Sequence, residues 1–115
     1  MHDSHRFLTG VWNDGRIGTY RGIREGQVGF GATVYCEKEI VSAGKFEGYE
    51  PLLVKIAEFF ETGKPPVSVE ETLEIYAFLE AADESLRQAG QPVSISQTLA
   101  ASRKKADDLR AKGKP

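Results

Sequence analysis

The spacing of hydrophobic residues along the chain changes near residue 48, from a period of two to a helical period. Asp14-Gly15 interrupts the first part and suits the positive φ angles of a tight hairpin turn. Alternation of apolar and polar residues is typical of strands with one covered face. We therefore predict an antiparallel β-meander of about four strands within 7–44. The strand candidates are 7–12, 16–23, 28–36 and 40–43.

A first helix is predicted directly after the glycine-rich half. Pro51 is tolerated in its first turn, and Gly63 is placed to end it. Lys64-Pro65-Pro66 prevents the helix from continuing. Its residues Leu52, Leu53, Ile56, Ala57, Phe59 and Phe60 form a broad apolar stripe.

Two more helices are predicted in the last third of the chain. Ser68 with Glu71 three residues later forms a capping box for one helix, which ends near Gly90. The other begins at Ser94 and extends to about Lys112, with few apolar positions, so we expect it at the surface or against a partner. The stripe of the earlier helix comprises Thr72, Ile75, Tyr76, Leu79, Ala82 and Leu86.

Strands followed by helices predict the α+β class, with the helices packed on one face of the sheet. We expect a flexible N-terminus over 1–6, a single domain over 7–112 and a tail over 113–115. Within that domain, 7–44 forms the sheet and 49–112 is helical. The sole cysteine, Cys36, lies in an apolar run, which favours a buried, inert thiol.

The net charge of −2 conceals two regions of opposite sign. Residues 49–99 contain nine acidic and three basic residues, whereas residues 100–115 contain six basic and two acidic residues. The basic end contains no aromatic residue and includes Asp107 and Asp108, so a solvated helix end is favoured over a nucleic-acid site. No apolar run approaches the roughly 18 residues of a membrane span, and a cytoplasmic location is the default expectation.

Signals for catalysis and for nucleotide binding are missing from the sequence. The glycines of 26–31 do not have the dinucleotide-binding spacing, and they lie between two predicted strands instead of before a helix. The only histidines, His2 and His5, lie at the N-terminus, which would not preorganise a metal site. We therefore assign no catalytic, cofactor-binding or metal-binding residue.

Polar and aromatic residues around the first predicted hairpin are the best candidates for contacts with a substrate or another subunit. Arginine binds carboxylates and phosphates through two parallel hydrogen bonds, and aromatic rings stack on sugars or bases. Ordinary cross-strand pairing with Glu25, Glu37 and Glu39 is the alternative explanation of the arginines. The candidates are Trp12, Arg16, Tyr20, Arg21, Arg24 and Tyr35.

The segments 48–53, 56–67, 70–75, 81–85 and 90–93 resemble the C-terminal region of the Gfo/Idh/MocA oxidoreductases. Segment 12–22 also resembles a strand pair of some members. The resemblance implies an α+β domain whose open sheet shapes a sugar or polyol site and forms a subunit interface. Members carry a separate Rossmann domain for NAD(P), and they transfer a hydride.

The sequence departs from that family in the parts that perform its chemistry. The glycine motif is absent, and Glu37-Lys38-Glu39 lacks the proline of the family's Glu-Lys-Pro motif. We thus expect a truncated or split C-terminal domain of a dehydrogenase that neither binds NAD(P) nor catalyses a reaction on its own. Its expected partners are further copies of itself through the sheet, or a separate Rossmann-domain chain. A stand-alone ligand-binding or dimerisation module derived from the family is the alternative.

Overall fold

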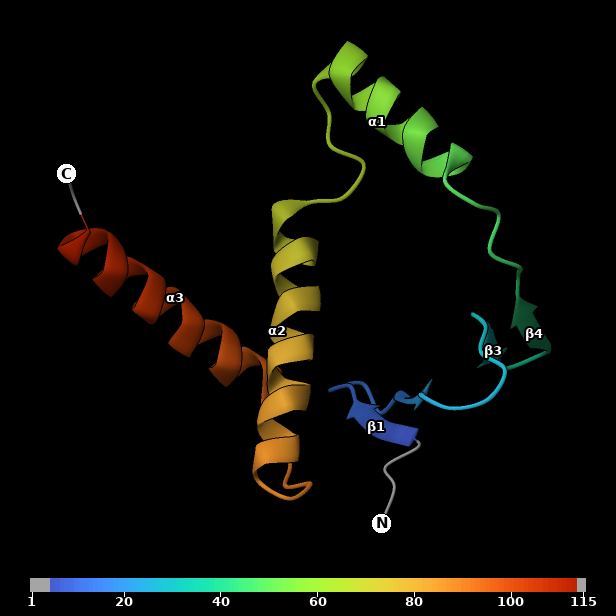
Figure 1. Ribbon diagram of the computed structural model, residues 1–115, viewed down its shortest axis with the longest axis horizontal. Coiled ribbons are helices and arrows are strands. Elements are labelled where there is room, and N and C mark those ends of the chain that lie inside the picture. Colours follow the sequence, from blue (N-terminus) through green and yellow to red (C-terminus); the bar gives the residue numbers. More distant parts are fainter. Residues whose placement is uncertain (1–4, 114–115) are drawn as a thin grey trace. The chain divides into compact units, whose positions relative to one another are not determined.

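The computed structural model describes residues 5–113, apart from the side chain of His5, and shows an α+β chain (Figure 1). Four strands precede three helices, and both strand pairs are antiparallel, which confirms the predicted class. The elements are β1 (His5–Val11), β2 (Ile17–Ile23), β3 (Ala32–Tyr35), β4 (Ile40–Ala43), α1 (Glu50–Thr62), α2 (Val69–Arg87) and α3 (Ile95–Lys112).

The strands form two hairpins, whereas we expected one continuous meander. β1 pairs with β2 so that Val11 lies opposite Ile17, and β3 pairs with β4 so that Val34 lies opposite Val41. The predicted strand over 28–36 is shortened to four residues. Gly29 and Gly31 provide no side chain that could hold residues 28–31 against a neighbouring strand. The packing of the helices on a sheet face stays a prediction.

The helices begin where their capping residues predict, and α1 also ends there, whereas α2 ends at Arg87, before Gly90. The Ser68 hydroxyl accepts a hydrogen bond from the Glu71 amide at 3.1 Å and so caps α2. The Ser94 hydroxyl accepts one from the Gln97 amide at 3.3 Å at the start of α3. Gly63 has a φ of 69° directly after α1, a left-handed conformation that glycine adopts without strain.

The described residues contain almost no core. The chain separates into two compact units, 1–57 and 58–115. Among residues 5–113 only Ala77 and Ala81 are buried, and both lie on α2 in the second unit, where α2 contacts α3. Alanine allows two helices to approach closely, which explains why the contact forms along this line of α2.

The exposure of Cys36 and the character of the helices bear on two further expectations. Cys36 is exposed, so the prediction of a buried thiol is wrong. Its position beyond the end of β3 leaves it without a covering layer, whatever the apolar character of its neighbours. Residues 1–4 and 114–115 lie outside the described residues. No helix within 5–113 is long and apolar enough to span a membrane.

Candidate functional site

The turn between β1 and β2 brings two of the candidate residues, Trp12 and Arg16, into contact, and Asp14 joins them. Asp14 accepts hydrogen bonds from the Arg16 amide at 3.1 Å and from Arg16 Nε at 2.8 Å. The Arg16 guanidinium carbon lies 5.7 Å from the centre of the Trp12 ring, within the range of a cation–π contact. Gly15 has a φ of 88° and donates a hydrogen bond to the Trp12 carbonyl, as the Asp-Gly sequence predicts. Contacts with Asp14 and Trp12, both within the turn, therefore hold Arg16 in place.

Two aromatic rings of this hairpin, those of Trp12 and Tyr20, lie over glycines of β2. A Cβ atom at Gly18 would lie 3.0 Å from the Trp12 ring, and one at Gly22 would lie 3.2 Å from the Tyr20 hydroxyl. The two glycines are half-buried, although the rings above them stay accessible. The absence of side chains at these two positions is thus what allows Trp12 and Tyr20 to lie against the strand.

Replacing Gly18 with valine is expected to displace the Trp12 ring from β2. The new side chain meets ring atoms at about the closest distance that Cβ atoms tolerate. Because the chain contains one tryptophan, its fluorescence should shift to longer wavelength as the ring becomes more hydrated. Gly29→Val is the matched control, since a Cβ atom there meets no other atom within 4 Å. Equal emission of the two variants would contradict the packing of Trp12 on Gly18.

The pKa of Asp14 lies below its usual value, chiefly because the Arg16 amide donates to the carboxylate and also because the Arg16 guanidinium does. A depressed pKa means that the folded turn favours the ionised form. The stabilisation is therefore present above the unfolded value of 3.8 and is lost as the pH falls through the lower folded value. We expect the Trp12 emission to change in this acid range, and the Asp14→Asn variant to lose that change. A transition that persists in Asp14→Asn would assign the effect to another group.

A second group of candidate residues lines a hollow of about 1180 Å³ in the first unit. Tyr20 and Arg21 contribute from β2, and Tyr35 contributes from β3. The hollow extends along residues 19–23 and 32–33, where neither β2 nor β3 has a second strand partner. Hydroxyl, guanidinium and aromatic groups there could contact a polar ligand, and the free backbone groups of both strands remain open to pairing.

The structure thus divides five of the six predicted contact residues between two places. Trp12 and Arg16 belong to the hairpin turn, whereas Tyr20, Arg21 and Tyr35 line the hollow. Arg24 follows β2 and lines neither. Sequence reasoning missed Ser42, near the end of β4, and Lys45, shortly after β4, which both line the hollow. Their place at the end of a strand was the available signal, but alternation alone does not show which strand ends lie near each other.

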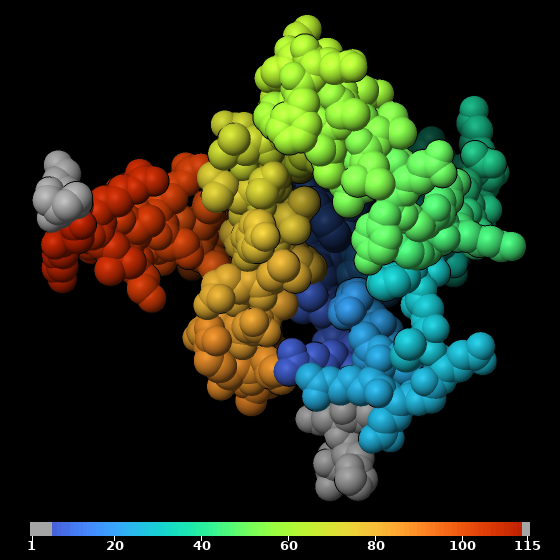
Figure 2. All heavy atoms as spheres, turned by 45° about the horizontal axis from the view of Figure 1, so that its top comes forward, coloured from blue at the N-terminus to red at the C-terminus, as the bar shows by residue number. Residues whose placement is uncertain are grey.

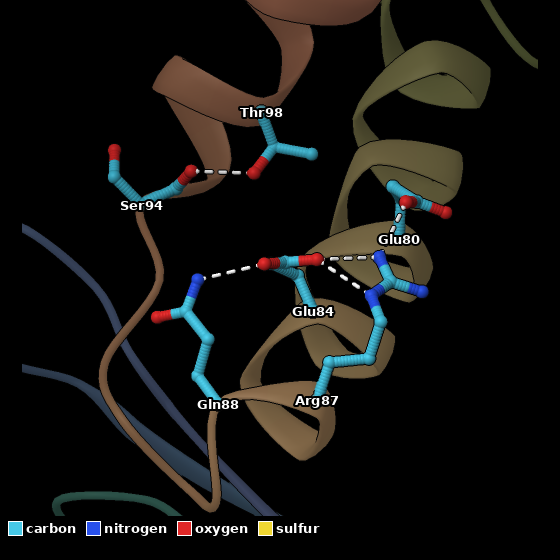
Figure 3. Close-up of polar contacts among 6 residues, drawn as sticks. All are labelled: Glu80, Glu84, Arg87, Gln88, Ser94 and Thr98. Atoms are coloured by element: carbon cyan, nitrogen blue, oxygen red, sulfur yellow. Dashed lines mark hydrogen bonds and ion pairs between the residues drawn. The ribbon is translucent and has the colours of Figure 1, made fainter.

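The second unit holds an open groove between α2 and α3. Leu73, Tyr76 and Ala77 of α2 and Leu99 of α3 provide apolar walls, and Lys105 lies at one side. Glu84 also lines the groove, and its carboxylate accepts hydrogen bonds from Gln88 at 2.7 Å and Arg87 at 2.6 Å (Figure 3). These two donors, Gln88 first, lower the pKa of Glu84. Glu84, Arg87 and Gln88 are therefore paired with one another within the helical hairpin.

Arg87 also donates to Glu80 at 2.9 Å, so one guanidinium joins two carboxylates on successive turns of α2 (Figure 3). The two carboxylates raise the pKa of Arg87. This cluster is an exposed ion-pair network that supports the end of the helix, where a positive charge also favours the helix dipole. It has neither the burial nor the unpaired donors of a catalytic site.

The described residues contain no group of three or more histidine, cysteine or acidic side chains placed to hold a metal ion. The motif His2-Asp3-Ser4-His5 falls outside the described side chains. Comparisons of the chain with models of known families, with curated proteins and with solved structures find no match.

Proposed function

We propose that the chain is a truncated or split C-terminal domain of a sugar- or polyol-specific NAD(P)-dependent oxidoreductase, with substrate-shaping and oligomerisation roles. In this proposal the chain neither binds the dinucleotide nor performs hydride transfer on its own. NAD(P) would be held by a Rossmann domain elsewhere, in a full-length relative or in a separate chain. The sequence resemblance suggests the family, and the exposed face of the first hairpin supports the assembly role.

The observation that carries the assembly role is the apolar face of the β1–β2 hairpin. Val11 and Ile17 lie directly opposite each other, and Phe7 lies two pairs further along the same face. Their exposed fractions are 71% for Val11, 68% for Ile17 and 74% for Phe7. Large apolar side chains grouped on one face are typical of surfaces that another protein surface covers.

The energetics of small sheets point in the same direction. A two-stranded hairpin is marginally stable in water, and it needs further strands or a packed layer. Each hairpin has two strands, and none of the side chains described in them, from Arg6 onward, is buried. A second copy that covers Val11 and Ile17 would supply the missing layer for the β1–β2 hairpin. Both copies would gain this layer, because a two-fold interface uses the same patch of each chain.

The substrate-shaping role is supported by the hollow along β2 and β3. Its Tyr20, Arg21 and Tyr35 side chains combine aromatic surface with hydrogen-bond donors. That combination suits a polyhydroxylated ligand, which presents hydroxyl groups at its edges and C–H groups on its faces. Lys45 adds a second positive charge, beside that of Arg21, to the same hollow.

Titration of the isolated chain with NADH tests the proposal that the nucleotide-binding half lies elsewhere. We expect no saturable change in NADH fluorescence, because no glycine-rich loop in 5–113 precedes a helix that would receive a pyrophosphate. An intact dehydrogenase measured in parallel provides the positive control. Saturable binding at micromolar NADH would overturn the proposal.

A stand-alone ligand-binding or dimerisation module is the second candidate, and the exposed hairpin face favours it equally. The genomic neighbourhood separates the two. An adjacent reading frame that encodes a Rossmann domain supports the oxidoreductase, and co-expression should then yield a complex that binds NAD(P). A chain that binds polyols in the hollow without any such partner supports the module.

A further inference from the structure

Helix α2 has apolar residues on two opposite sides, and only one side contacts α3. Ala77 and Ala81 lie toward α3 and are buried. On the other side, residues at alternating spacings of three and four form a continuous line, which we call the α2 stripe: Thr72, Ile75, Leu79, Ala82 and Leu86. The exposed fractions of Ile75, Leu79 and Leu86 are 51%, 53% and 58%. This spacing is that of a helix surface that packs against another helix.

Helix α3 carries a second line with the same spacing, which we call the α3 seam: Ile95, Leu99, Ser102, Ala106 and Leu109. Its first half faces α2, where Leu99 and Ser102 line the groove between the helices. The C-terminal half of α3 then diverges from α2 (Figures 1 and 2). Leu109 in that half is 60% exposed, so the end of the α3 seam lacks a covering helix among the described residues.

The charges beside the two lines are opposite. The positions that flank the C-terminal half of the α3 seam are all basic, namely Arg103, Lys105, Arg110 and Lys112. The charged positions nearest the α2 stripe are Glu71 and Asp83, both acidic. In paired helices such flanking charges decide which partner and which orientation are preferred. The basic residues beside the α3 seam would meet like charges on another α3 and opposite charges on α2.

We propose that the C-terminal half of α3 docks on the α2 stripe of a second copy of this chain. A two-fold axis makes the exchange reciprocal, so each copy donates one basic seam and receives another on its acidic stripe. The interface buries Leu109 of one copy between the Ile75 and Leu79 side chains of the other. It uses neither hairpin, so it is separate from the sheet contact of the proposed function.

Complementary charge reversal tests this pairing. One variant, Arg110→Glu with Lys112→Glu, makes the α3 flank acidic, and the other, Glu71→Lys with Asp83→Lys, makes the α2 flank basic. Each variant alone should self-associate at least about tenfold more weakly than the wild-type chain, because both of its contacts join like charges. Mixed together, the two variants should form a heterodimer, because both contacts then join opposite charges. Sedimentation velocity and mass spectrometry of the mixture read out the result.

Two controls make the experiment decisive. Lys104→Glu changes the charge of α3 on the side opposite the seam, so it should leave association unchanged while Lys105→Glu weakens it. Each of the two double variants is also made with Ile17→Lys, which weakens the sheet contact. The heterodimer should still form when both chains carry Ile17→Lys. Far-ultraviolet circular dichroism confirms that the variants keep their helices. Absence of a heterodimer from folded variants, or equal effects at Lys104 and Lys105, would overturn the proposal.

Discussion

Replacing Ala81 with glutamate is expected to detach α3 from α2 and to lower the free energy of unfolding of the helical unit by about 2–4 kcal/mol. Ala81 is 5% exposed and, with Ala77, lies where the two helices contact. A carboxylate at this position would lose its hydration, and the larger side chain would force the helices apart. Urea unfolding followed by circular dichroism measures the change.

Ala100→Glu is the matched control for this prediction. It introduces the same side chain into a helix, at an exposed position of α3. Alanine and glutamate differ little in helix propensity, so the control should change the free energy of unfolding by a few tenths of a kcal/mol. Similar losses for Ala81→Glu and Ala100→Glu would show that the two alanines do not hold the hairpin together.

Replacing Ile17 with lysine is expected to weaken self-association through the β1–β2 hairpin by about 100-fold. Ile17 lies opposite Val11 at the turn end of the exposed apolar face, and a lysine there would place an uncompensated charge inside the covered surface. The hairpin itself should persist, because Ile17 makes no buried contact within its own unit. Sedimentation equilibrium of chains that also carry Arg110→Glu and Lys112→Glu, which weaken the proposed helix contact, gives the dissociation constant of the hairpin contact.

Gln27→Lys provides the control for Ile17→Lys, since it adds the same charge in an exposed loop segment after β2. The emission of Trp12 should stay unchanged in both variants if the hairpin remains folded. A dissociation constant of Ile17→Lys equal to that of the control would place the interface of the hairpin elsewhere.

Local signals in the sequence predict the helices and the first hairpin well. Ser68 and Ser94 cap their helices, Gly63 follows the end of α1, and Gly15 adopts the positive φ that its turn requires. Each of these features depends on residues within about one turn of each other. The limits of β4 and α1 accordingly agree with the prediction to within one residue.

Features that depend on distant residues could not be obtained in the same way. The alternation of 28–36 indicates a strand but does not show that β2 and β3 remain unpaired. The apolar stripe of α2 was predicted from its spacing, yet of its residues only Tyr76 lines the groove beside α3, where Ala77 and Ala81 are buried. Small residues contribute little to a hydrophobic pattern, although they allow the closest helix contact.

The candidate site likewise combines contacts that depend on neighbouring residues with contacts that depend on distant ones. The contact between Trp12 and Arg16 follows from a short turn, and its residues could be grouped from the sequence. The presence of Tyr20 and Tyr35 in one hollow depends on two separate hairpins. The shared site of these two residues was therefore beyond prediction from alternation alone.

The central claim is that the exposed apolar faces of this chain are covered by further copies of itself. Sedimentation velocity of the full chain, from low to high micromolar concentration at low salt, tests it most directly. We predict a species with at least twice the 12.7 kDa mass of the chain, which dissociates on dilution. A single 12.7 kDa species throughout that concentration range would contradict the account.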